Sequence, residues 1–274
     1  MIRKAAVAGY FYPGHEDGLT RQIESFPLGE HERSEVFGVI APHAGYAYSG
    51  QVAAMVYARS KIQGTALLLG PNHGSGRGLM APKVSAQTRG DWEIPTRTFS
   101  IDTDLARILI QTSCKECEIA DVPWAHEDEH SLEVQLPFLS HFSPVNRFVP
   151  VIISRIDDKQ VFSLAECIYE SIRKYAKPVT LVASTDMSHY VPGETATRLD
   201  RLAMERIEAM DPRGLLETVR AHGISMCGVQ PAAVVLEVCR RLGATGAELV
   251  KYQTSGDVSG DYSSVVGYCG YMIV

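Results

Sequence analysis

The alternation of apolar runs with helical patterns predicts an α/β chain. Apolar runs at 36–41 and 65–69 each stop at a proline or at a glycine followed by a proline, as buried strands commonly do. The segment 49–57 between them has the apolar spacing of a helix, and Ser49 is placed to cap its first turn. A strand, a helix and a second strand in this order are typical of two parallel strands joined by a crossover helix.

The same alternation continues to the end of the chain. We expect Pro137 to kink one helix and Pro231 to lie in the first turn of another, where its missing N–H costs little. The predicted helices cover 102–112, 127–141, 158–175, two segments within 194–221, and 230–242. The predicted strands cover 147–154, 178–183, 247–254 and 263–273, with an extended pair between 79 and 101.

Nothing in this pattern divides the chain. No linker, repeat or low-complexity run interrupts it, so we expect one domain over residues 1–274. The predicted fold is a three-layer sandwich, in which a mainly parallel central sheet carries helices on both faces. The glycine-rich segment 70–78 reads as a loop and lacks the Lys-Ser/Thr pair of a phosphate-binding loop, so we do not predict nucleotide binding.

Composition narrows the classes of function. The 26 basic residues against 32 acidic ones give a formal net charge of -6 without a basic stripe, which argues against a nucleic-acid partner. No run approaches the roughly 18 apolar residues of a membrane span, and the N-terminal segment lacks the apolar core of a secretory signal. Six cysteines in a chain of this length are not typical of a disulfide framework, so we expect a reduced, cytoplasmic setting.

Candidate metal ligands follow three of the predicted strands. His43 and His73 come directly after the first two, and Asp186 and His189 come after a third. Parallel strands bring such loops to one edge of the sheet, where open α/β proteins bind their ligands. Cys227 precedes the last predicted helix, whose positive end favours a thiolate. The sequence therefore predicts a metal site at this edge.

The residue types indicate the chemistry of that site. Two neutral imidazoles and one anionic ligand, with coordination positions left open, are typical of non-haem Fe(II) oxygenases, and here a thiolate would replace the carboxylate. A thiolate extends the candidates to copper and zinc. Asp186 is placed to fix the tautomer of His189 for base chemistry. The structural alternative is that each histidine is a hydrogen-bonded loop residue and that Cys227 packs as a small apolar side chain.

Other motifs carry competing interpretations. The segment 126–130 matches the H-E-x-x-H pattern of zinc proteases, but no third ligand follows at the usual spacing, so we interpret the match as coincidental. His130 is still expected to line the crevice, with Tyr46 as part of an aromatic wall for a substrate. Cys114 and Cys117 form a lone C-x-x-C that follows a predicted helix, which predicts neither a zinc site nor a redox site.

Taken together, these segments resemble the Memo family. The resemblance rests on AVAGYFYPG, APHAGYAYSG, LLLGPNHG, EHSLEVQLPFL, STDMSHY and MCGVQP, which extend over essentially the whole chain. It implies a fold similar to that of class III extradiol dioxygenases, which hold non-haem Fe(II) with two histidines and a glutamate. By this resemblance, His43 and His73 are metal ligands, Cys227 takes the place of the carboxylate, and His189 matches the catalytic base, accompanied by Asp186.

The cysteine departs from the dioxygenase pattern, so ring cleavage of catechols is not carried over. One hypothesis is a metal-dependent redox enzyme acting on an unidentified small molecule, with Fe(II) preferred over copper or zinc. The other is a non-catalytic module whose crevice accepts a phosphotyrosine-type peptide or another anionic ligand, an affinity described for animal family members. The resemblance also implies a radical-SAM protein as a partner, as for prokaryotic members.

Overall fold

The centre of the computed structural model, which describes residues 1–74 and 80–274, is a large mixed sheet. Four parallel strands form its middle in the order β10, β5, β11, β3, and β14 continues the sheet antiparallel to β3. These strands are almost entirely buried, which agrees with their continuous apolar runs. Their bounds are β3 (Gly38–Ala41), β5 (Thr65–Pro71), β10 (Arg147–Ile153), β11 (Val179–Ser184) and β14 (Val265–Ile273).

Shorter strands extend both edges of this core. The expected extended pair between 79 and 101 is an antiparallel hairpin of β7 and β8, and β8 joins the main sheet beside β10. The other strands of the main sheet are β1 (Ile2–Lys4), β6 (Val84–Ala86), β7 (Asp91–Ile94), β8 (Arg97–Ile101), β9 (Ala120–Asp121), β12 (His189–Val191) and β13 (Ala247–Thr254). A separate two-stranded sheet pairs β2 (Ser34–Glu35) with β4 (Ser60–Lys61).

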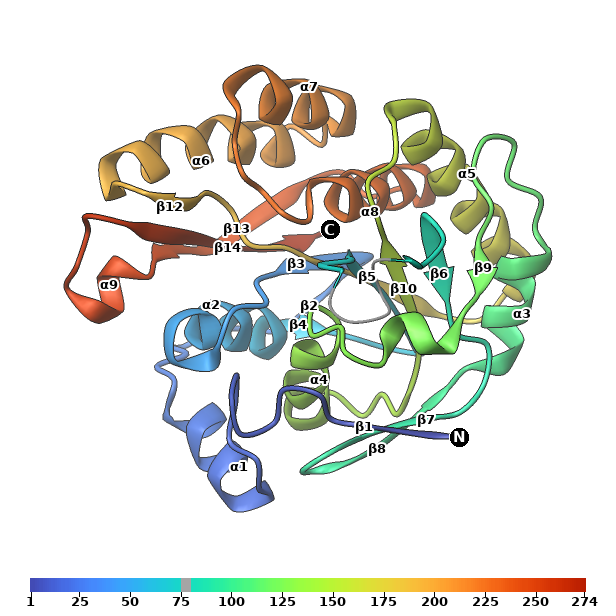
Figure 1. Ribbon diagram of the computed structural model, residues 1–274, viewed down its shortest axis with the longest axis horizontal. Helices are drawn as coiled ribbons and strands as arrows, with labels where there is room; N and C mark the ends of the chain where they lie inside the picture. Colours follow the sequence, from blue (N-terminus) through green and yellow to red (C-terminus); the bar gives the residue numbers. More distant parts are fainter. Residues whose placement is uncertain (75–79) are drawn as a thin grey trace.

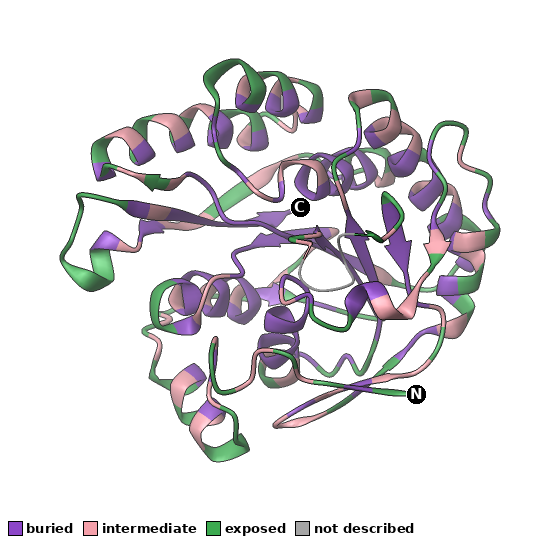
Figure 2. Ribbon diagram, viewed as in Figure 1, coloured by how far each residue is buried: buried purple, intermediate pink, exposed green. Residues whose placement is uncertain are grey.

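Helices cover both faces of the sheet, as the sequence predicted (Figure 1). One layer contains α5, α6, α7 and α8, with α3 against α5, and the other contains α1, α2 and α4. The buried residues of the larger helices face the sheet and the exposed ones face outward (Figure 2). The helices are α1 (Glu16–Ser25), α2 (Tyr46–Arg59), α3 (Thr103–Gln111), α4 (Leu136–Phe142), α5 (Asp158–Tyr175), α6 (Gly193–Glu208), α7 (Pro212–His222), α8 (Val229–Leu242) and the short α9 (Gly256–Ser259).

Two helix predictions were wrong in part. The expected helix over 127–141 is only α4, preceded by a 3-10 turn at Glu133–Gln135, and Pro137 lies in its first turn instead of kinking it. The helix α2 begins at Tyr46, so Ser49 is inside it and does not cap it. The hydroxyl of Ser49 donates to the carbonyl of Ala44 instead. Of the predicted 70–78 loop, the first two residues belong to β5, and 75–79 lie outside the described residues.

The cysteines also depart from expectation. Cys114 is joined to Cys167 of α5 by a disulfide, with Cα atoms 5.4 Å apart, whereas Cys117 is a free, buried thiol. The two cysteines of the C-x-x-C motif therefore have different roles: one forms a disulfide and the other packs in the core. Within the described ranges, no helix combines the length and the apolar character needed to cross a membrane.

Candidate metal centre

Three neighbouring parallel strands place the candidate residues at one edge of the sheet. His43 follows β3, His73 follows β5 and Asp186 follows β11, which lies between them. The ring centroids of His43 and His73 are 5.1 Å apart. Asp186 Oδ2 lies 3.9 Å from His43 Nε2. The loops predicted to converge therefore do so.

The hydrogen bonds around His43 determine which ring nitrogen is available. Its Nδ1 lies 2.9 Å from Ser184 Oγ, and that hydroxyl already donates its own proton to the carbonyl of Ser131 at 2.6 Å. Ser184 must therefore accept from His43, so the proton of a neutral ring is on Nδ1. His43 Nε2 then carries the free lone pair that a metal ligand needs.

A buried carboxylate, Glu129, orients the second imidazole. It accepts from the backbone N–H of His73 at 2.7 Å and from its ring Nδ1 at 2.9 Å. The backbone N–H of Ser131 also donates to it at 2.8 Å, and His130 Nδ1 lies 3.4 Å away. Burial opposes ionisation of Glu129, but the hydrogen bond and the charge from His73 lower its pKa to about 2. A carboxylate behind a histidine in this way is the usual support of a metal ligand.

His130 joins His43 and His73 in a cluster that could hold a metal ion. One nitrogen from each ring lies within 4.8 Å of the other two, whereas nitrogen ligands of one ion are about 3–4 Å apart. The three imidazoles would therefore need to move only slightly toward one another to share one ion. Burial lowers the pKa of His43 well below its usual value and that of His130 to about 4. Both are neutral at pH 7, which is the form that binds metals.

Cys227 contacts this cluster through His43. Its sulfur lies 3.2 Å from His43 Nε2 and accepts from the backbone N–H of Asp186 at 3.2 Å. Nitrogen and sulfur ligands of one ion are about 3.1–3.6 Å apart at typical bond lengths. The helix α8 does not by itself produce a thiolate, contrary to expectation, because burial and the nearby Asp186 raise the pKa of Cys227 to about 12. A bound cation would make the thiolate favourable here.

His189 is also at the pocket, but Asp186 does not orient it through a hydrogen bond. Its Nδ1 lies 2.7 Å from the carbonyl of Met187 and 2.9 Å from that of Ser225. Carbonyls only accept, so Nδ1 carries the proton and Nε2 is free to take one up. The carboxylate of Asp186 accepts instead from the backbone N–H of His43 at 2.8 Å. Burial raises the pKa of Asp186 to about 6.

The pocket over these residues has a volume of about 570 Å³ and an aromatic lining. Tyr46 is not part of it, because its ring stacks on Phe138 in the core and its hydroxyl donates to the carbonyl of Val134 at 2.7 Å. The aromatic residues that do line the pocket are Phe11, Tyr48, Tyr190 and Tyr268.

Sequence reasoning missed several of these groups. Tyr48 is in the segment APHAGYAYSG, two residues beyond Tyr46, and Tyr190 follows His189 directly. Glu129 was visible only as part of the H-E-x-x-H match. Tyr268, on β14, carried no signal in the sequence. Its place in the pocket depends on the antiparallel addition of β14 to the sheet.

The H-E-x-x-H match has no protease geometry. His126 is in the 3-10 turn Pro123–His126, fully buried and 5.8 Å from the ring of Trp92, whereas His130 is in the cluster. No α-helix contains both residues, so their imidazoles do not share a helix face. The coincidental interpretation agrees with this arrangement.

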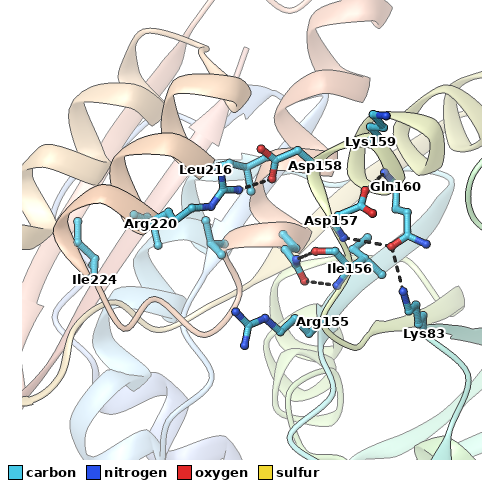
Figure 3. Close-up of a pocket in the computed structure, with 14 residues that line it drawn as sticks. Lys83, Arg155, Ile156, Asp157, Asp158, Lys159, Gln160, Leu216, Arg220 and Ile224 are labelled. Carbon is cyan, nitrogen blue, oxygen red and sulfur yellow. Dashed lines mark hydrogen bonds and ion pairs between the residues drawn. The ribbon is translucent and has the colours of Figure 1, made fainter.

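A larger cavity of about 940 Å³ is lined by the loop after β10, by the first residues of α5 and α8, and by α7 (Figure 3). Its described lining includes no histidine or cysteine. Several of its polar side chains bond one another, because Arg220 pairs with Asp158 and Gln160 accepts from Lys83 and from the backbone of Asp157. The histidine pocket is therefore the candidate site, although it is the smaller of the two.

Comparisons with known proteins find relatives that match nearly the whole chain. A family model described as Memo-like protein matches residues 3–272. A MEMO1 family protein of Methanopyrus kandleri is 41% identical, covering 98% of this chain and 97% of that protein. Similar relatives occur in Methanothermobacter thermautotrophicus, with 39% identity over 98% and 99% of the two chains, and in Desulfurococcus amylolyticus, with 39% over 97% and 96%.

Proposed function

This chain belongs to the Memo-like protein family. We propose that its histidine pocket binds a redox-active metal ion and acts on a small molecule. The observation that carries the proposal is the cluster of His43, His73 and His130, whose ligand atoms lie within 4.8 Å of one another. Three imidazoles whose nitrogens approach one another this closely at the end of a sheet form a ready set of nitrogen ligands.

We propose His43, His73 and Cys227 as the ligands, with His130 as a further donor. Support comes from the 3.2 Å separation of the Cys227 sulfur and His43 Nε2, and from the free lone pair on that nitrogen. Glu129 supports the second ligand by holding Nδ1 of His73, which leaves the opposite nitrogen for the metal. The sulfur also accepts from a backbone N–H, which helps to stabilise a thiolate.

We propose Fe(II) as the ion because the chain resembles the Fe(II)-binding class III extradiol dioxygenases, and copper or zinc as alternatives because imidazole and thiolate ligands suit them. When bound, such an ion supplies open coordination positions and, if it is iron or copper, one-electron chemistry. The residues of the chain would then bind and orient the substrate beside it. His189 would take a proton from a substrate hydroxyl at its free Nε2, because both carbonyls at Nδ1 hold the ring in that tautomer.

An oxygen-uptake assay tests the enzymatic part of this proposal. Protein purified without oxygen and loaded with Fe(II) is desalted, and oxygen consumption is followed with ascorbate as the reductant. We expect uptake above that of the metal-free protein, and uptake no higher than that of metal-free protein in His73→Ala, which loses a proposed ligand. The control His141→Ala removes an exposed imidazole from α4. Uptake equal to that of metal-free protein, or unaffected by His73→Ala, would contradict the proposal.

The alternative, a module for phosphotyrosine-type peptides, has less support. A phosphate dianion is usually held by arginine or lysine. The described residues that line the pocket include none of these and present the carboxyl groups of Asp186 and Asp261. Calorimetric titration with a phosphotyrosine peptide decides the question. Binding heat with the phosphorylated peptide, and none with the same peptide without its phosphate, would favour the module.

A further inference from the structure

The hydroxyl of Tyr268 is an exception among the buried tyrosines. Its side chain is only 2% exposed, and within residues 1–74 and 80–274 no group donates to it or accepts from it. The other buried tyrosines of the described chain all use their hydroxyls, for example Tyr12 toward Glu133 and Tyr271 toward Glu208. The ring is buried, but the hydroxyl oxygen is not sealed in the core, so it faces the open space of the pocket that the residue lines.

The position of Tyr268 explains where this hydroxyl can be satisfied. Side chains alternate along a strand, so Tyr268 shares a face of β14 with Gly270, which approaches Val56 of α2. Across the ladder, Gln253 pairs with Tyr268 and donates to the carbonyl of Tyr48 at the start of α2. Tyr268 therefore lies on the face of the sheet that carries α2, beside the strand residue that bonds the first turn of that helix.

Tyr268 also lines the pocket that contains His43, Asp186 and His189. This proximity to the candidate metal ligands makes a bound molecule the natural partner of its hydroxyl. Burial, with the nearby Asp186, raises the pKa of Tyr268 above its ordinary value, so the group is a hydrogen-bond donor at neutral pH. A donor at this position fits an acceptor oxygen.

We propose that Tyr268 is a ligand-binding residue that donates a hydrogen bond to an oxygen of a small organic molecule held at the histidine cluster. The molecule is neutral or singly charged and presents a carbonyl, phenol or hydroxamate oxygen. Phe11, Tyr48 and Tyr190 line the same space and offer ring faces to a planar group. This inference rests on the proposed metal site, because the ion is what would draw such an oxygen ligand into the pocket.

Acetohydroxamate is a suitable probe, since it is small, planar and binds metals through oxygen. The full-length protein is loaded with Co(II), its metal content is measured, and the probe is titrated by visible absorption. We expect Tyr268→Phe to bind acetohydroxamate about tenfold more weakly, with metal content and unfolding midpoint unchanged. Tyr10→Phe is the matched control, because it removes the hydroxyl of an 89% exposed ring outside the pocket lining.

The outcomes separate the two proposals. A metal content near zero in the wild-type protein refutes the proposed function and, with it, this inference. A loaded protein in which Tyr268→Phe binds the probe as tightly as wild type refutes the role of Tyr268 alone. A lowered unfolding midpoint in Tyr268→Phe would mean that the hydroxyl has a structural partner, and it would also overturn the inference.

Discussion

Glu129 holds His73 by two hydrogen bonds, one from the backbone N–H at 2.7 Å and one from ring Nδ1 at 2.9 Å. The same carboxylate lies 3.4 Å from His130 Nδ1. One buried side chain therefore orients His73 and lies beside a second of the three clustered imidazoles. Arg3 anchors this segment in turn, by donating to the carbonyl of Glu129 at 2.8 Å.

Replacing this carboxylate weakens the metal site. We expect Glu129→Gln to lower metal affinity about 10–100-fold, the usual cost of losing the partner behind a ligating histidine. Competition with a chromogenic chelator measures the change. Glu127→Gln is the control, because Glu127 is exposed two residues away. Equal affinities in wild type and Glu129→Gln would show that the carboxylate does not support a metal ligand.

The tautomer of His189 is a second prediction. Two carbonyls face its Nδ1, so we expect the neutral ring to carry its proton there and to leave Nε2 unprotonated. Nitrogen-15 NMR of histidine-labelled protein above pH 8 distinguishes the two tautomers. A proton on Nε2 would remove the basis for His189 as the base.

Gly228, between Cys227 and the start of α8, is expected to tolerate no side chain. A Cβ at this position would lie 2.3 Å from the carbonyl oxygen of Ser184, which is backbone and cannot move aside cheaply. We expect Gly228→Ala to lose about 1–3 kcal/mol of unfolding free energy and to displace Cys227. Gly246→Ala is the control, since its Cβ would meet nothing within 4 Å. Urea denaturation compares the two, and equal stability would contradict this packing.

Asp102 should make the stability of the fold depend on pH. Burial opposes its ionisation, but hydrogen bonds from Tyr175, Leu105 and Thr65 lower its pKa below the usual value. A carboxylate with a lowered folded pKa stabilises the protein above its unfolded pKa of about 3.9 and loses that contribution as the pH falls through the folded value.

We therefore expect Asp102→Asn to cost about 1–3 kcal/mol at pH 7 and progressively less below pH 4. Urea unfolding of both proteins at pH 7 and pH 3 measures the difference. A cost that does not shrink in acid would mean that the charge of Asp102 contributes nothing.

Local patterns were sufficient for most of the fold. The helix expected over 158–175 is α5 at the same bounds, and strand 247–254 is β13. The prediction of one helix over 127–141 was wrong for a non-local reason. The leucines of this segment have helical spacing, but its buried glutamates bind groups that are distant in the sequence. Glu133 accepts from Arg3 and from the hydroxyl of Tyr12, which no local pattern reveals.

For the site, the sequence could place His43 and His73 because each follows an apolar strand, and strand order then fixes their proximity. It placed His130 in the crevice but could not place it among the clustered imidazoles, since that depends on an irregular segment near Glu129. It also could not distinguish Tyr46 from Tyr48. The two residues differ by the turn that starts α2, and only one of them faces the core.

Metal stoichiometry in a double variant tests the shared site most directly. Wild type and His43→Ala/His73→Ala are loaded anaerobically with Fe(II), desalted and analysed for bound metal, with circular dichroism to verify that both are folded. We predict about one ion per chain in the wild type and only background metal in the folded double variant. The same stoichiometry in both proteins would contradict a metal site built on these two histidines.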